Sequence, residues 1–314
     1  MRRSLACAAL ALFLVAPVLL AQGGGQKPLK SDNFDVYADD PAKAKEKAAQ
    51  LEEAARTFQR VFGVRPPRGA VHLGANALSG GGMSGMGGGG ATKPGEAVWT
   101  LPWPDDMGNL LKNLPQGTQL PQGMSGTGGM ESQMDALTHE AAHLMFLHHV
   151  NPGCIAALQQ NFNGYGSFLP DWIDEAVAVY HEPESMKATR RQQMKELVDQ
   201  HIPLSRFFTM NHPIGAHGPG AGGAGGIDPA DLQKKLQELS QGGVGGEANL
   251  FYVQSLSVFE FMLEAGGPTF VRKLVEHLQK GGTTEAGLAL LSRRELKTLE
   301  GFESAWVAWE KARR

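Results

Sequence analysis

The chain has 314 residues, of which 42% are hydrophobic, so it is long enough to bury a substantial core in one or two domains. Its formal net charge is −3 and it has no basic stripe, which argues against nucleic acid as a partner. Glycine is unusually frequent, with 41 residues that gather partly in blocks, so several segments are expected to be loops outside the core.

The first 21 residues have the pattern of a secretory signal peptide. Two arginines open the segment, an apolar run follows over residues 5–20, and Ala21 precedes the expected cleavage site. The alternative is a retained membrane anchor, because the run approaches spanning length. Cleavage predicts a secreted, periplasmic or cell-envelope protein with a net charge of 27 − 32 = −5. Cys7 would leave with the signal, so Cys154 could form no intrachain disulfide.

Residues 22–130 are predicted to form a small N-terminal lobe of sheet plus helix. Three segments have the pattern of strands: 33–38, 69–75 and 97–103. The run 41–62 places apolar residues at helical spacing, and Gly63 is a plausible C-cap for that helix. The segments 79–95 and 104–130, rich in glycine, are predicted to be loops.

A short motif near the middle of the chain contains residue types that can bind a metal ion. His139 and His143 lie four residues apart with Glu140 beside the first, the H-E-x-x-H pattern of zinc hydrolases, within a helix predicted over 130–149. Positions i and i+4 lie on one side of a helix about 6 Å apart along its axis, so the two imidazoles can bind one metal ion. Glu140 then flanks the open coordination position.

A second helix is predicted over 172–182, with Asp171 as its N-cap. Glu175 lies among apolar residues in this helix, and a glutamate in such surroundings requires a compensating cation. The neighbouring Asp174 is expected to be solvated. The two helices together favour a metal site.

The two motifs resemble those of the gluzincin metallopeptidases. More narrowly, they look like the bacterial peptidase MA-like family, whose second motif runs near P-x-W-L-x-E-G-x-A-x-Y. Five residues match that motif in register: Pro170, Trp172, Glu175, Ala178 and Tyr180. Ala176 stands where the family usually has glycine. The resemblance implies a zincin-like α+β fold in which one Zn²⁺ ion is held by three residues: His139, His143 and Glu175.

The resemblance also implies roles for further residues. Glu140 would be the general base, and a following helix often supplies a Tyr or His that stabilises the oxyanion, which makes Tyr252 the expected residue. A core or interface role for Tyr252, or the use of Tyr180 instead, stays open. The thermolysin branch has an acid four residues after the glutamate ligand to orient a histidine, but Val179 occupies that position here. Three other acids are candidates for that role: Asp135, Asp171 and Asp174.

The remaining histidines are not expected to bind the metal. His149 falls where metzincins place a third histidine, but that pattern requires glycine at the position of Phe146. On an unbroken helix His149 would lie about 15 Å from His139 along the axis. His148 and His149 are predicted to be surface residues near the helix C-terminus. Four more are predicted to be structural, surface or lid residues: His72, His201, His212 and His217.

Residues 131–314 are predicted to form a mainly helical part that completes one catalytic unit with the N-terminal lobe. A buried helix should begin at residue 247 and break at 266–268, with more helices over 268–279, 284–291 and 294–312. The predicted function is a secreted zinc-dependent peptidase acting on a peptide or protein, in contact with a membrane only if the N-terminal segment is retained. The alternative is a catalytically silent zincin-like binding or scaffold module of the cell envelope, against which the intact Glu140 argues.

Overall fold

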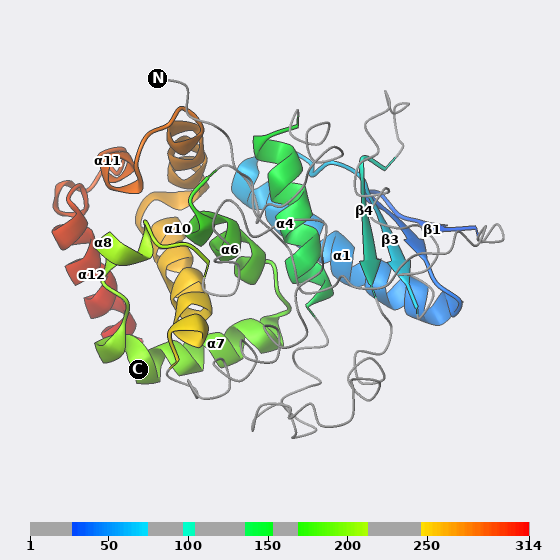
Figure 1. Ribbon diagram of the computed structural model, residues 1–314, viewed down its shortest axis with the longest axis horizontal. Coiled ribbons are helices and arrows are strands. Elements are labelled where there is room, and N and C mark those ends of the chain that lie inside the picture. The colour runs from blue at the N-terminus through cyan, green and yellow to red at the C-terminus, as the bar shows by residue number, and fades with distance from the viewer. Residues whose placement is uncertain (1–26, 75–96, 104–135, 153–168, 213–245, 314) are drawn as a thin grey trace, which may run out of the picture.

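The computed structural model describes residues 27–74, 97–103, 136–152, 169–212 and 246–313. In these ranges the protein is α+β and mostly helical, with one small sheet at one side and a group of helices at the other (Figure 1). The expected signal segment, the glycine-rich loops, Cys154 and His217 lie outside the described residues. Within the described ranges, no helix combines the length and apolar character needed to cross a membrane.

Four strands form the sheet, in the order in which they occur along the chain: β1 (Leu29–Lys30), β2 (Phe34–Tyr37), β3 (Gly69–Leu73) and β4 (Trp99–Trp103). β1 pairs antiparallel with β2, whereas β2, β3 and β4 are parallel. Side chains alternate between the two faces of a strand, so the aligned residues Val36, Val71 and Leu101 share one buried face. The three predicted strands are confirmed.

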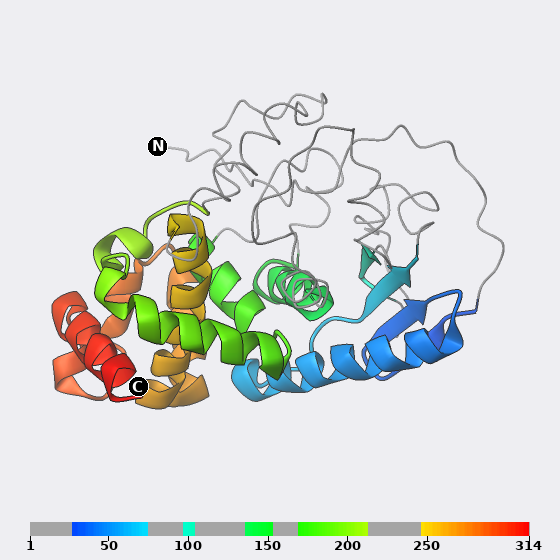
Figure 2. The same cartoon turned by 90° about the horizontal axis from the view of Figure 1, so that it is seen from below.

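The long helix α1 (Pro41–Phe62) makes the crossover that the parallel pair β2–β3 requires. Asp40 caps its N-terminus by accepting a hydrogen bond from the backbone N–H of Ala42, and Gly63 ends it in the left-handed conformation with φ 75°. The predicted bounds of this helix are confirmed. Figure 2 shows α1 running along the sheet, and its apolar side chains pack against the buried face described above.

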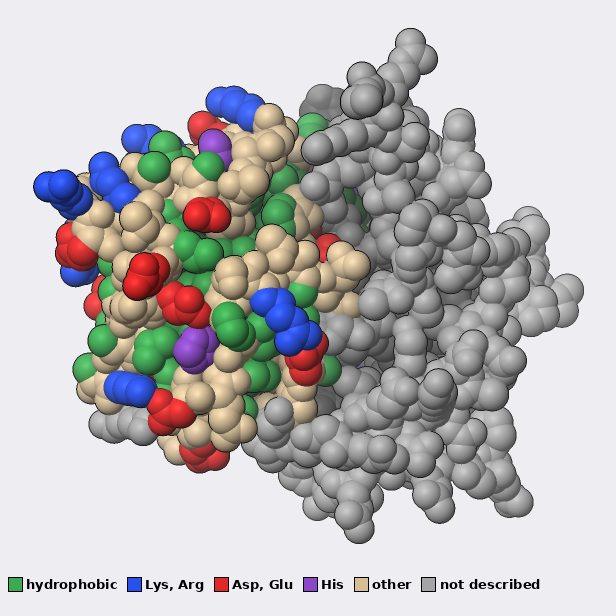
Figure 3. All heavy atoms as spheres, turned by 60° about the vertical axis from the view of Figure 1, so that its left-hand side comes forward, with side chains coloured by type: hydrophobic (Ala, Val, Ile, Leu, Met, Phe, Trp, Pro, Cys, Tyr) green, Lys and Arg blue, Asp and Glu red, His purple; other side chains and the backbone are tan. Residues whose placement is uncertain are grey.

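Helices make up the rest of the described chain. The α-helices are α4 (Leu137–Val150), α6 (Asp171–Tyr180), α7 (Glu184–Leu197), α8 (Leu204–Phe207), α10 (Glu247–Gln279), α11 (Thr284–Leu288) and α12 (Leu299–Ala312), and the 3₁₀ turns are η2 (Val198–Gln200) and η3 (Arg294–Leu296). The predicted break in α10 is confirmed at Gly267, whose φ of 67° and ψ of −179° are not helical and precede Pro268. Charged side chains of both signs are interspersed on the described part of the face shown in Figure 3.

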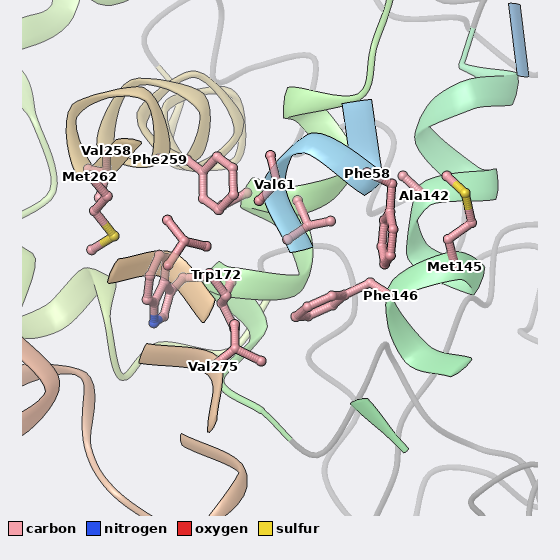
Figure 4. Packing of buried hydrophobic residues seen from close by; sticks show 14 of the residues in the cluster. Phe58, Val61, Ala142, Met145, Phe146, Trp172, Val258, Phe259, Met262 and Val275 are labelled. Carbon is pink, nitrogen blue, oxygen red and sulfur yellow. The ribbon is translucent and has the colours of Figure 1, made fainter. Parts of the chain in front are cut away.

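One hydrophobic core joins the sheet side of the molecule to the helical side. Figure 4 shows aromatic side chains from α1, α4, α6 and α10 within this core: Phe58, Phe146, Trp172 and Phe259. All four are fully buried. The helix that carries the H-E-x-x-H motif is therefore fixed between α1 on one side and α6 on the other, which places its polar residues with little freedom.

This packing corrects the prediction that His148 and His149 lie at the surface. His148 is only 5% exposed, and burial lowers its pKa to about 4. The ring of His149 lies edge-on to Phe58, with 5.6 Å between ring centroids, and 5.3 Å from the ring of Phe62. For His149 the prediction failed because α1, which is distant in sequence, packs against the C-terminal half of α4.

Candidate metal centre

Three side chains converge between α4 and α6. His139 and His143 come from successive turns of α4, and their Nε2 atoms are 3.2 Å apart. Glu175 on α6 places Oε1 at 3.5 Å from His139 Nε2 and Oε2 at 3.7 Å from His143 Nε2. Donor atoms bound tetrahedrally at 2.0–2.1 Å from one ion lie about 3.4 Å from one another, close to these separations.

The predicted ligand set is thus assembled in space, and its three residues are all buried. One donor atom from each lies within 4.8 Å of the other two, and no other such group occurs in the part of the chain that the structure describes. His139, His143 and Glu175 can therefore hold a metal ion. Two imidazoles and one carboxylate leave a tetrahedral ion with one open position.

Charge interactions among His139, His143 and Glu175 shift the pKa values of all three. Burial opposes protonation of His139, but Glu175 and a hydrogen bond to Glu182 outweigh it and raise the pKa of His139 to about 9. Burial and the charge of His139 lower the pKa of His143 to about 3. Burial alone would raise the pKa of Glu175, but the facing imidazoles of His139 and His212 hold it below its ordinary value. A metal ion would displace the proton that His139 carries, because only a neutral imidazole can be a ligand.

A carboxylate outside the ligand set orients His139. Glu182 Oε1 lies 2.9 Å from His139 Nδ1, and Arg190 donates from Nε and Nη2 to the two oxygens of Glu182, each at 2.5 Å. When Nδ1–H donates to Glu182, Nε2 is left to face Glu175 and His143 as a ligand atom. Sequence reasoning missed Glu182. Glu182 lies seven positions after Glu175, which is about two helical turns. This spacing would place both side chains on one face of a continued helix, although α6 itself ends at Tyr180.

The acids expected in that orienting role act differently. Asp171 is not the N-cap, a position that Pro170 occupies; its Oδ2 instead accepts a hydrogen bond of 2.7 Å from the backbone N–H of His212. Asp174 is fully buried, so the prediction of a solvated acid is wrong as well. Its helix is enclosed by α4 and α10, and almost every residue of α6 is buried. Asp135 lies outside the described residues.

His212 was predicted to be a surface or lid residue, and this is also wrong. Only 2% of it is exposed, and its Nε2 lies 3.3 Å from Glu175 Oε2. Its ring stands edge-on to those of Phe251 and Tyr252, each with 5.4 Å between centroids. The chain that follows α8 returns to the start of α6, and Asp171 fixes that return. No local pattern in the sequence signals such a contact.

The two residues expected to act on a substrate lie beside the ligand set. Within the described ranges, the buried Oε2 of Glu140 has no hydrogen-bond partner, and burial raises the pKa of this carboxyl. The ring of Tyr252 lies 6.3 Å from that of His139. Burial, followed by the nearby Glu175 and Glu140, raises the pKa of Tyr252 well above 10, so its hydroxyl stays protonated and can donate.

Other predicted candidates lie elsewhere. Tyr180 packs against Phe259, with 5.1 Å between ring centroids, and beneath the ammonium group of Lys187. His72 stacks on Tyr37 at 4.2 Å on the sheet, which agrees with its predicted structural role. His201 lies 3.1 Å from Glu303 Oε1 on α12.

Comparisons of the chain with protein-family models, with curated proteins and with solved structures find no match.

Proposed function

We propose that the protein is a secreted zinc-dependent peptidase of the gluzincin type, with a zincin-like fold. The observation that carries this proposal is the convergence of His139, His143 and Glu175 at ligand separations, with the carboxylate of Glu140 next to them. The secreted location depends on the signal pattern of residues 1–21. A peptide or protein is the proposed substrate.

Zinc is the metal that this donor set favours. Two imidazoles and one carboxylate with an open fourth position form a common catalytic zinc set, whereas Mg²⁺ and Ca²⁺ prefer oxygen ligands throughout. When bound, zinc supplies Lewis acidity, which polarises a carbonyl group and lowers the pKa of a bound water to about 7. The orientation of His139 by Glu182 is the kind of contact that such sites use to fix the tautomer of a ligand.

The chain's own residues then complete the hydrolysis. Glu140, with an oxygen not engaged in a hydrogen bond among the described residues, takes the proton from the attacking water and delivers it to the leaving amine. Burial raises the pKa of Glu140, which makes its carboxylate a stronger proton acceptor than an exposed one. The hydroxyl of Tyr252 donates to the oxyanion that develops on the substrate.

Two substitutions separate metal binding from hydrolysis. Purified wild-type protein should contain about one zinc ion per chain, and Glu175→Ala should lose it. Glu140→Gln should keep the zinc but reduce cleavage of a peptide library by about 10²–10⁴-fold, because the proton acceptor is gone. Glu303→Gln, which alters a carboxylate on α12, is the control and should keep both properties.

The results of these measurements distinguish a zinc peptidase from a catalytically silent metal-binding module. A wild-type protein that binds no metal contradicts the proposal. Zinc binding without cleavage of any library peptide contradicts the peptidase assignment and favours a silent metal-binding module. Unchanged turnover in Glu140→Gln removes this residue as the base.

A further inference from the structure

Four side chains from different parts of the chain form a closed ring of contacts beside the metal ligands. His139 on α4 contacts Glu182, which follows α6; Glu182 contacts Arg190 on α7; and Arg190 lies over the ring of Tyr252 on α10, with its Cζ 5.4 Å from the ring centroid. The ring closes between Tyr252 and His139, whose centroids are 6.3 Å apart. One guanidinium group is thus adjacent both to the partner of a ligand and to the expected oxyanion donor.

Arg190 is suited to fixing Glu182 in place. Its Nε lies 2.5 Å from Oε2 and its Nη2 lies 2.5 Å from Oε1, a two-point contact between a planar fork and a carboxylate. Glu182 is only 3% exposed, and a buried carboxylate without a partner would be strongly destabilising.

We propose that Arg190 is a positioning residue of the metal site, which fixes Glu182 and through it holds His139 in the orientation and tautomer that bind the ion. This inference rests on the proposed metal site but names a residue on α7, a helix that contributes no ligand. Lysine could not substitute fully at this position. A lysine ammonium supplies the charge but not the planar fork that contacts both carboxylate oxygens of Glu182.

The chain contains a matched control in the next residue. Arg191 is on the same helix and also donates from Nε and Nη2 to a glutamate, in its case to the single oxygen Oε1 of Glu260, at 2.8 and 2.6 Å. Its other partner is Glu184 on α7. Arg191 therefore has the same chemistry and the same ability to stabilise helix packing, but it is paired with carboxylates that do not touch the ligand set.

The test measures zinc affinity by competition with a chromophoric chelator, on full-length protein whose folding is checked by circular dichroism. We expect Arg190→Gln to weaken zinc binding at least tenfold, within the 10–100-fold range typical for partners of metal ligands. Arg190→Lys should recover part of this loss. Arg191→Gln should leave the affinity unchanged while lowering the unfolding temperature, which separates an effect on the site from an effect on the fold.

A double-mutant cycle shows whether Arg190 acts through Glu182. In a Glu182→Gln background, Arg190→Gln should weaken zinc binding no further, whereas independent structural effects would add. Equal zinc affinity in wild type and Arg190→Gln, or full additivity with Glu182→Gln, overturns the inference while the proposed function stands. A wild-type chain that binds no zinc overturns both. If Arg190→Gln does not fold, the comparison of Arg190→Lys with Arg191→Lys decides the question in the same way.

Discussion

Two groups of buried polar side chains in this protein differ in how their members are paired. At the start of α10, the side chain of Gln254 accepts from the backbone N–H of Ile202 and donates to the carbonyl of the same residue, each at 2.8 Å. Both functional groups of this buried amide are therefore satisfied by the protein itself. A similar chain joins Trp306, Ser257 and Glu310 farther along the helix.

The group formed by His139, His143 and Glu175 differs because its potential ligand atoms converge on one point. Two imidazole nitrogens approach to 3.2 Å, and both oxygens of Glu175 face nitrogen atoms of these rings at 3.5 and 3.7 Å. The two contacts of Glu175 are long for hydrogen bonds, and all three separations suit ligands arranged around an ion. The comparison teaches that an amide paired with one backbone residue serves structure, whereas imidazole nitrogens and carboxylate oxygens that converge at ligand separations form a group that can hold a cation.

The largest expected difference between the two groups is their response to metal removal. With free zinc at about a thousand times the dissociation constant, binding should stabilise the folded chain by about 4 kcal/mol. A chelator should therefore lower the midpoint of urea unfolding of the wild type. Glu175→Ala should unfold at the same midpoint with and without chelator, because its site no longer binds the ion. Equal chelator sensitivity in both proteins would contradict the assignment of the ligands.

A second experiment removes the hydrogen bonds between Gln254 and the backbone of Ile202. Gln254→Leu preserves the approximate volume but leaves the N–H and carbonyl of Ile202 without their partner in the core. We expect a loss of about 2–4 kcal/mol in the free energy of unfolding, because each orphaned backbone group costs about 1–3 kcal/mol. Zinc stoichiometry should stay at that of the wild type. The control is Gln192→Leu, at an exposed position on α7, which should change stability by less than about 0.5 kcal/mol.

These two regions also show how far the sequence could be used for prediction. The ligands were predictable because the i, i+4 spacing of His139 and His143 is a local property of a helix, and because Glu175 interrupts an otherwise apolar helix. The bounds of α1 were predictable for the same reason, since proline and glycine mark its ends. The zincin-like fold, the zinc and the peptidase activity stay predictions.

The contacts that surround the ligands depend on tertiary structure and were not predictable in this way. His212 reaches Glu175 only because α8 and the chain after it return to the start of α6, and the sequence between them has no pattern that fixes this path. Arg190 contacts Glu182 although the connection between α6 and α7 and about two turns of α7 lie between them in the sequence. Asp174 was misjudged because its exposure depends on α4 and α10, which cover the helix from both sides.

The smallest predicted effect concerns two histidines on one helix that titrate in opposite directions. His139 faces carboxylates, and its pKa is raised to about 9, whereas burial alone lowers the pKa of His148, five residues beyond His143, to about 4. In the unfolded chain His148 becomes protonated as the pH falls below 6.5, whereas in the folded chain it stays neutral until about pH 4. The free energy of unfolding therefore falls as the pH falls through this window. The shift predicts a loss of about 2 kcal/mol at pH 5 relative to pH 7.

His148→Leu isolates this contribution, because leucine does not titrate and is compatible with a buried position. Unfolding by urea at pH 7 and pH 5, with chelator present in every sample, prevents metal release from contributing to the difference. We expect the wild type to lose about 2 kcal/mol more than His148→Leu over this interval. An equal loss in the two proteins would show that His148 is protonated in the folded state at pH 5. The C-terminal end of α4 around His148 would then be accessible to solvent. The contrast between a histidine buried among carboxylates and one buried without them would no longer hold.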